Sequence, residues 1–294
     1  MISVAVLCGL ISTFAFGIAS GLIKGVVDKY GPIKAIVLRN FVTVVALISA
    51  LLYLHTPLIL DWPYLGIGLV IAIAGYFPYM FFVMSLQHGK VGVIMPVIAP
   101  HIVLMSVMGF VFLGDTFDIT KVLTAAFILT GVVLVSINLR DFRNSHLFSL
   151  ESGVPLALLA ALLWGVVLPL FKIPSVVLGA LEYGLILETV IFFSALIHSL
   201  YQDGGFVPAK WPVTHLYSRV GIYVLLVGIG TAIGTVFLNI GFGTGQVSLV
   251  SSISACSLVV AVVIGALCFG EKFSLKQYLA AGIVTLGILI PLLF

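Results

Sequence analysis

The stretch "FLGDTFDITKVLTAAFILTGVVL" (Phe112–Leu134) and the stretch "CFGEKFSLKQYLAAGIVTLGILI" (Cys268–Ile290) follow one plan. Each passes from a glycine and an acidic residue into an almost wholly apolar run. At an offset of 156 residues, Asp115 stands opposite Glu271, and both are acidic. Identical residues at this offset are Gly114 and Gly270, Phe117 and Phe273, Leu123 and Leu279, Ala125 and Ala281, and Gly131 and Gly287.

A second pair of stretches matches at an offset of 148. "FGIASGLIK" (Phe16–Lys24) and "WGVVLPLFK" (Trp164–Lys172) both begin with an aromatic residue and a glycine, and both carry lysine eight residues after the aromatic. The two offsets differ by eight residues, which fits an insertion in the polar loop Tyr201–Pro212. Because both matches occur in the same order along the chain, they indicate one structural unit used twice.

The composition indicates a membrane protein. Of the 294 residues, 62% are hydrophobic and 8% are charged, and a soluble domain could not bury that much apolar surface. Apolar runs of about 20 residues, each long enough to span the bilayer as a helix, recur along the chain and lack the alternation of a barrel. We therefore expect an all-α polytopic membrane protein with ten transmembrane helices. They are predicted over residues 2–27, 33–54, 62–87, 91–113, 118–138, 151–172, 176–201, 216–243, 246–269 and 274–293.

The polar stretch Asn138–Ser152 divides the chain into a first five-helix repeat over 1–138, a linker over 139–150 and a second repeat over 151–294. Five helices are an odd number, so the second repeat enters the membrane from the opposite side, as in many secondary transporters. Basic residues support inverted repeats, since antiparallel halves need opposite charge bias to share one cytoplasmic face. In the first half, one membrane face carries Lys24, Lys29, Lys34, Arg39 and Lys90, and the opposite face carries only Lys121. In the second half, one face carries Lys210, Arg219, Lys272 and Lys276, and the opposite face carries only Lys172.

Several classes of function are excluded or disfavoured. The first apolar run has no basic n-region or small-residue cleavage site, so we interpret it as a mature helix and not a signal peptide. Cys8, Cys256 and Cys268 lie inside apolar runs without a second soft ligand at metal spacing, so we expect no metal and no cofactor. No GxxxxGK[ST], HExxH or GxSxG motif occurs, which argues against ATP-driven transport and against an enzyme. A net charge of +3 is too small to suggest nucleic acid.

The segments "FGIASGLIK", "LRNF" and "WGVVLPLFK", with the "GD" and "GEKFSLKQYLAAGIVTLGI" junctions, resemble the EamA-type ten-helix members of the drug/metabolite transporter superfamily. The resemblance covers almost the whole chain. It implies two inverted five-helix bundles around a central cavity, with helices 1–4 and 6–9 lining it and helices 5 and 10 outside. It also implies a secondary transporter of small metabolites such as amino acids, or of sugars and their conjugates.

Ionisable residues at membrane depth are costly and therefore mark candidate sites. Glu188 falls near the middle of helix 7 and His101 near the middle of helix 4. We expect Glu188, together with His101, to bind the amino part of a substrate or to exchange a proton. The alternative is that Glu188 serves packing alone through a hydrogen bond to a neighbouring helix.

Three basic residues could attract a carboxylate or phosphate. Lys24 and Lys172 occupy equivalent places in the two halves, and Arg39 lies one or two turns into helix 2. The alternative for both lysines is snorkelling to the membrane interface. Polar or aromatic candidates for the cavity wall are Asn40, Tyr76, Tyr79, Trp164, Asn239, Ser251 and Ser254.

Other features have structural interpretations. Pro96 and Pro100 free backbone carbonyls in helix 4, which is tolerated only against protein or water, so this segment should face the cavity. Gly17, Gly21 and Gly25 form a small-xxx-small stripe that favours close helix packing. The junction carboxylates Asp115 and Glu271 are interpreted as helix caps.

We therefore predict alternating-access transport of small polar or amphipathic metabolites, with amino-acid-like solutes favoured, across the cell (inner) membrane. The partners are a small-molecule substrate and the lipid bilayer, with a coupled proton or counter-solute, and the protein is a monomer or a homodimer. The alternatives are a sugar, nucleotide-sugar or phosphate-ester exchanger of the same fold and a non-transporting membrane scaffold.

Overall fold

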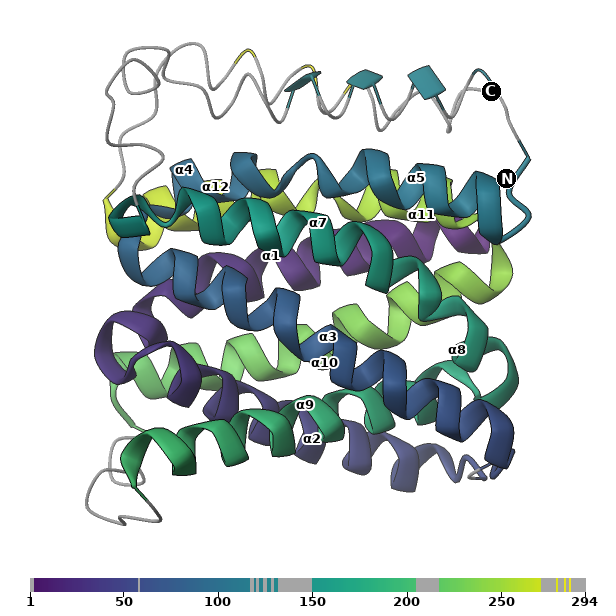
Figure 1. The fold of residues 1–294 in the computed structure, drawn as a ribbon, viewed down its shortest axis with the longest axis horizontal. Helices are drawn as coiled ribbons and strands as arrows, with labels where there is room; N and C mark the ends of the chain where they lie inside the picture. Colours follow the sequence, from purple (N-terminus) through teal and green to yellow (C-terminus); the bar gives the residue numbers. More distant parts are fainter. Residues whose placement is uncertain are drawn as a thin grey trace.

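The computed structural model describes residues 3–57, 59–116, 150–204 and 217–270, with isolated positions between 119 and 131 and between 279 and 286. Over these ranges all regular secondary structure is helical, and the helices lie side by side in one bundle (Figure 1). Apart from the isolated positions, the predicted helices over 118–138 and 274–293 lie outside the described residues, as do residues 139–149 of the linker predicted over 139–150.

Eight of the ten predicted spans fall within the described ranges. The first half contains α1 (Val4–Tyr30), α2 (Pro32–Leu54), α3 (Trp62–His88), α4 (Val91–Ile98) and α5 (His101–Phe112). The second half contains η1 (Leu150–Ser152), α7 (Val154–Leu170), α8 (Lys172–Leu178), α9 (Ala180–Asp203), α10 (Arg219–Thr244), α11 (Val247–Ser254) and α12 (Ser257–Phe269). Seven helical segments of the described part are long and apolar enough to cross a membrane, with α7–α8 and α11–α12 each taken as one. The protein is therefore a helical multi-pass membrane protein.

The predicted boundary between helices 6 and 7 is wrong. The sequence prediction ended helix 6 at residue 172, before Pro174, but the chain continues as α8 to Leu178 and turns at Gly179. Pro174 lies in the first turn of α8, where backbone N–H groups have no partner within the helix, so its missing N–H costs no hydrogen bond. The turn itself needs Gly179, whose φ of 97° is unfavourable for residues with a Cβ atom.

Special backbone positions recur at the two offsets found in the sequence. Gly31 and Gly179, 148 residues apart, have φ of 80° and 97° and separate the first two helices of each half. Gly114 and Gly270, 156 residues apart, have φ of 74° and 72°. Both members of each pair therefore occupy a conformation that favours glycine.

The fourth span of each half is broken near its middle. α4 and α5 are separated by a turn at residues 99–100, and α11 and α12 by a turn at residues 255–256, again 156 residues apart. Pro100 accompanies the first break, while the second lacks proline. There, Ser251 and Ser252 donate hydrogen bonds to the carbonyls of Val247 and Ser248, a pattern that bends helices.

Glycines bring α1 close to its neighbours, as the stripe in the sequence predicted. A Cβ atom at Gly21 would lie 2.6 Å from Ile264 of α12, and Gly17 directly contacts Val260 of the same helix. On α10, a Cβ atom at Gly234 would meet the ring of Phe16 at 2.7 Å. Because a larger residue at these positions would push the helices apart, the glycines allow backbone approach and dense packing around α1.

Candidate functional site

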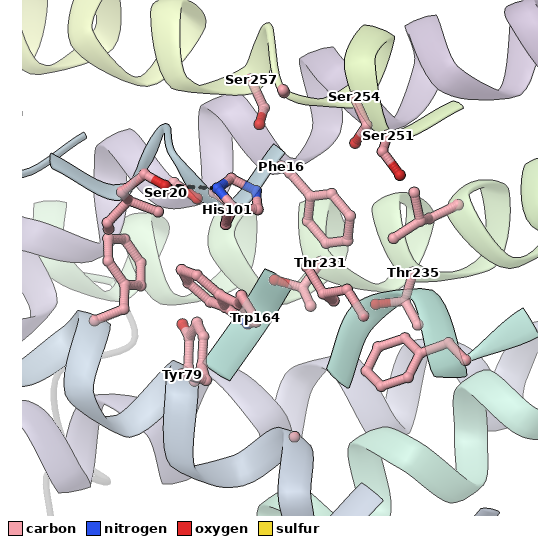
Figure 2. Close-up of a pocket in the computed structure, with 18 of the residues that line it drawn as sticks. Phe16, Ser20, Tyr79, His101, Trp164, Thr231, Thr235, Ser251, Ser254 and Ser257 are labelled. Carbon is pink, nitrogen blue, oxygen red and sulfur yellow. Dashed lines mark hydrogen bonds between the residues drawn. The ribbon is translucent and has the colours of Figure 1, made fainter. Parts of the chain in front are cut away.

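A cavity of about 1090 Å³, its open mouth included, lies inside the bundle (Figure 2). Each of the eight predicted spans that fall within the described residues contributes to its wall, which agrees with the helices that the resemblance implied. The lining is mainly apolar and aromatic with a few polar groups, the usual composition of a small-molecule site. The polar groups include an ion pair with two threonines bound to it, a set of serines, His101 and Asn239.

The ion pair joins α2 to α9. Arg39 Nη2 lies 3.2 Å from Glu188 Oε2 and 3.3 Å from Oε1, and the residues are 5% and 2% exposed. Arg39 donates to Thr231 Oγ1 through Nε at 3.0 Å and to Asn40 Oδ1 through Nη1 at 2.9 Å. The ring of Tyr79 lies 4.1 Å from Arg39 Cζ, within the range of a cation–π contact. The guanidinium is therefore bonded through all three of its nitrogen atoms.

The carboxylate of Glu188 has partners on two other helices, α2 and α10. Besides Arg39, Oε1 accepts a hydrogen bond from Thr235 Oγ1 at 2.8 Å, and Oε2 accepts one from Asn40 Nδ2 at 2.9 Å. Asn40 Nδ2 also donates to the backbone carbonyl of Glu188 at 3.0 Å. Buried charges are tolerated when they are paired and hydrogen-bonded in this way. Glu188 therefore makes the hydrogen bonds to neighbouring helices that a packing role would require. Together with Arg39 it also forms part of the cavity wall.

Aromatic rings form a second part of the wall. Trp164 of α7 lies at centroid distances of 5.3 Å from Phe82, 6.1 Å from His101 and 6.4 Å from Tyr79. Figure 2 shows Trp164, Tyr79 and His101 grouped on one side of the cavity and Ser251, Ser254 and Ser257 on another. Large apolar ring faces of this kind suit the apolar part of a small solute.

His101 takes its position from the break between α4 and α5. As the first residue of α5, it places Nδ1 2.7 Å from the carbonyl oxygen of Ile98. A carbonyl only accepts hydrogen bonds, so Nδ1 carries the proton and Nε2 is an acceptor when the ring is neutral. His101 lines the cavity, so a solute that donates a hydrogen bond could use this nitrogen.

Serines and one asparagine complete the polar lining. Ser251, Ser254 and Ser257 come from the broken α11–α12 segment, and the hydroxyls of Ser254 and Ser12 lie 3.1 Å apart. Asn239 of α10 lines the cavity and donates through Nδ2 to the carbonyl of Ala180 at 3.2 Å. Its acceptor atom Oδ1 is buried without a hydrogen-bond partner in the described part of the chain.

The structure brings most of the sequence-predicted site residues together. Those that line the cavity are Arg39, Tyr79, His101, Trp164, Glu188, Asn239, Ser251 and Ser254. Asn40 is fully buried behind the ion pair and contacts both of its members.

Lys24, Lys172 and Tyr76 do not belong to this lining. Lys24 donates to the carbonyl of Leu86 at 2.6 Å and pairs with Asp28 at 2.8 Å. Lys172 lies on α8, and Tyr76 hydrogen-bonds His198 of α9 at 2.7 Å. The hypothesis that the two lysines form the rim of the central cavity is therefore not supported by their positions.

Two residues that contact the ion pair were missed. Thr231 and Thr235 lie one helical turn apart on α10 and bind Arg39 and Glu188 respectively. Sequence analysis named only Asn239 of this helix as a candidate for the cavity wall. The i, i+4 threonines in "GTAIGT", in a helix with few polar residues, were the available signal.

Comparison with known proteins decides the family. The sequence model described as the EamA-like transporter family matches residues 3–137 and again residues 151–293. The chain belongs to the EamA-like transporter family. Members of this family are membrane transporters of the drug/metabolite transporter superfamily, so this EamA-like chain is a multi-pass membrane protein of transporter type.

A solved structure shares the fold of this EamA-like protein. It is titled "Crystal structure of protein", is 19% identical, and matches with a TM-score of 0.76 over 100% of this chain and 98% of that chain. At this identity the likeness concerns the fold alone. No curated protein matches the chain in sequence.

Proposed function

We propose that this EamA-like protein is a secondary transporter that carries small amphipathic metabolites with little net charge, amino-acid-like solutes above all. The observation that carries this proposal is the internal cavity, whose wall combines aromatic rings with a charge-compensated Arg39–Glu188 pair.

The charge of the lining argues for the solute class. Among the described lining residues, the positive charge of Arg39 is balanced by the negative charge of Glu188 at 3.2 Å. A multiply charged phosphate ester would lose its hydration without gaining a free cation to replace it. A zwitterion instead brings both signs, and its ammonium group can donate to Asn239 Oδ1 and His101 Nε2. Its apolar side chain would lie against Trp164 and Phe82.

The mechanism that we propose is alternating access between inverted repeats over 1–138 and 151–294, joined by the linker over 139–150. Glycines with positive φ recur at the offsets 148 and 156, and so do the breaks in the fourth span of each half, which supports a duplicated unit. The cavity lies between these two sets of helices, where repeats that rock against each other would expose it to each side in turn. A proton or a second solute would supply the coupling, and the cell (inner) membrane is the proposed location.

Solute counterflow tests the proposal. The full-length protein is reconstituted in liposomes loaded with an unlabelled neutral amino acid, and entry of the labelled amino acid is measured. We expect uptake above that of protein-free liposomes, and we expect Asn239→Ala to reduce it while the exposed Lys90→Gln leaves it unchanged.

Two results would contradict the proposal. Uptake confined to phosphorylated sugars or nucleotide sugars would favour the exchanger alternative, in which Arg39 leaves Glu188 to bind the phosphate. An absence of uptake across a panel of amino acids, sugars, polyamines and nucleotides, by protein that remains monodisperse, would favour a non-transporting scaffold.

A further inference from the structure

Lys172 is a candidate site that the proposed transport mechanism does not use. It lies in a wide-open groove outside the central cavity, with a volume of about 640 Å³ when the open solvent above it is included. The remaining lining residues are Tyr64 at the start of α3, Phe112 and Leu113 at the end of α5, and Ile173, Val176 and Val177 of α8. Apart from Lys172 and the hydroxyl of Tyr64, the side chains of this lateral groove are apolar.

The counterpart of Lys172 in the first half has partners that Lys172 lacks. Lys24, 148 residues earlier, pairs with Asp28 at 2.8 Å and donates to the carbonyl of Leu86 at 2.6 Å. The residue equivalent to Asp28 is Val176, which is apolar and 58% exposed. Within the described ranges, no ion pair or hydrogen bond involves Lys172 Nζ, so this charge is available to an anion from outside the protein.

The region around Lys24 that corresponds to this groove is filled by protein. In the first half, the position equivalent to Ile173 is Gly25, and it packs against Tyr223 and Phe269, whose ring centroids are 6.2 Å apart. Beside these rings, Arg219 donates a hydrogen bond to the carbonyl of Cys268 at 3.2 Å, which links α10 to the end of α12. Among the described residues, side chains therefore fill the region beside Lys24, whereas the equivalent region beside Lys172 is an open groove.

The groove lies at the level of a lipid headgroup. Lys172 is six residues before the end of α8, about 9 Å along the helix axis, at the end of the bundle where α3 begins and α5 ends (Figure 1). Trp62 and Tyr53, exposed by 72% and 83%, lie at the same end and are typical of the membrane interface. A lysine one or two turns below the interface reaches headgroup phosphates by snorkelling.

We propose that the lateral groove binds one anionic phospholipid. The phosphate group pairs with Lys172 Nζ, and one acyl chain lies against Phe112, Val176 and Val177. Asp61, the acidic residue at the start of α3, caps that helix through the N–H of Tyr64 and forms no ion pair with Lys172. The apolar groove with a single unpaired cation thus complements a lipid better than it complements a free phosphate ion.

Lipid competition on the purified full-length protein tests this proposal. Native mass spectrometry would count phosphatidylglycerol and phosphatidylcholine molecules with the same acyl chains that remain bound from an equimolar mixture. One lysine near the surface of an anionic membrane corresponds to about a fivefold preference for the anionic lipid. We expect this preference in the natural protein and its loss in Lys172→Gln.

Substitution at Val176 offers a sharper test because it leaves the lysine in place. Val176→Asp restores the i, i+4 pair that Lys24 makes with Asp28, and it should abolish the preference, while Val176→Asn should retain it. Lys90→Gln, an exposed lysine at the other end of the bundle, should change nothing.

Three outcomes would overturn the proposal. They are an unchanged preference in Lys172→Gln, an equal loss in Lys90→Gln, and a natural protein that retains both lipids alike. A phosphatidylglycerol with a photoreactive acyl chain should also crosslink to α3, α5 or α8, which line the groove, in the natural protein, and crosslinks found only on other helices would contradict the assignment. These measurements do not depend on transport, so their outcome tests the lipid site independently of the proposed function.

Discussion

Replacing Glu188 by glutamine should destabilise the protein strongly, because it leaves the buried guanidinium of Arg39 uncompensated. The two residues are 2% and 5% exposed, and the carboxylate accepts hydrogen bonds from Arg39, Thr235 and Asn40. Glutamine keeps one acceptor oxygen but replaces the other by an amide nitrogen that would face donors. Breaking a buried ion pair from one side costs about 3–5 kcal/mol, so we expect the free energy of unfolding to fall by about 3 kcal/mol.

A double-mutant cycle isolates the pair from the rest of the site. Removing both charges with Arg39→Met and Glu188→Gln should recover much of the loss, which gives a coupling energy of about 2–3 kcal/mol. The matched control is the pair between Lys34 and Asp203, 3.0 Å apart but with side chains exposed by 19% and 15%, for which we expect less than about 1 kcal/mol.

Reversible unfolding in mixed detergent micelles, followed by tryptophan fluorescence, provides the measurement. Trp164 lies on the wall of the same cavity and should report on the site directly. If the coupling between Arg39 and Glu188 is no larger than that of the control pair, the two charges are not buried as a unit, and the account of the cavity as charge-compensated is wrong.

Three further predictions concern the cavity wall and the packing. Trp164→Ala removes the ring 5.3 Å from Phe82 and should raise the KM for counterflow several-fold without unfolding the protein, whereas Trp164→Phe should change it little. Asp115 accepts hydrogen bonds from the N–H groups of Val247 and Ser248 at the start of α11, so Asp115→Ala should lower thermal stability by about 1 kcal/mol and Asp115→Asn by less. Gly21→Leu should clash with Ile264 and destabilise the protein by more than about 2 kcal/mol, while Gly66→Leu, which meets open space, should be tolerated.

The contact of Asp115 illustrates what a local interpretation misses. Sequence analysis assigned the carboxylate to capping, on the basis of its place before an apolar run. It does cap a helix, but that helix is α11 of the other half, 132 residues away in the chain. The preference of a carboxylate for free N–H groups is visible in the sequence, while the helix end that it meets depends on how the two halves pack.

The membrane character and most helix limits could be predicted because each depends on local properties. Long apolar runs require helices in lipid, and punctuation by glycine and polar residues marks their ends. The error at Pro174 arose because a proline can end a helix or begin one. The sequence offered no means of choosing between these, and the turn at Gly179 decided it.

The candidate site was only partly predictable, for a related reason. Scarcity of ionisable groups in apolar runs singled out Glu188 and His101, while Lys24, Lys172 and Arg39 were all candidates for binding an anion. Because burying a charge is costly, ionisable residues are rare in apolar runs, and this rarity is visible in the sequence. The sequence does not show which residue pairs with a buried charge and offsets that cost.

By itself, then, the sequence determined that this protein is a duplicated bundle of membrane helices with a few polar residues at depth, because hydropathy and repetition are carried along the chain. Only the tertiary structure decided that Arg39 and Glu188, 149 residues apart, neutralise one another on the cavity wall. It also decided that Lys24 finds a partner while Lys172 faces an open groove. Such pairings depend on which helix faces meet in space, and packing across the whole bundle sets those faces.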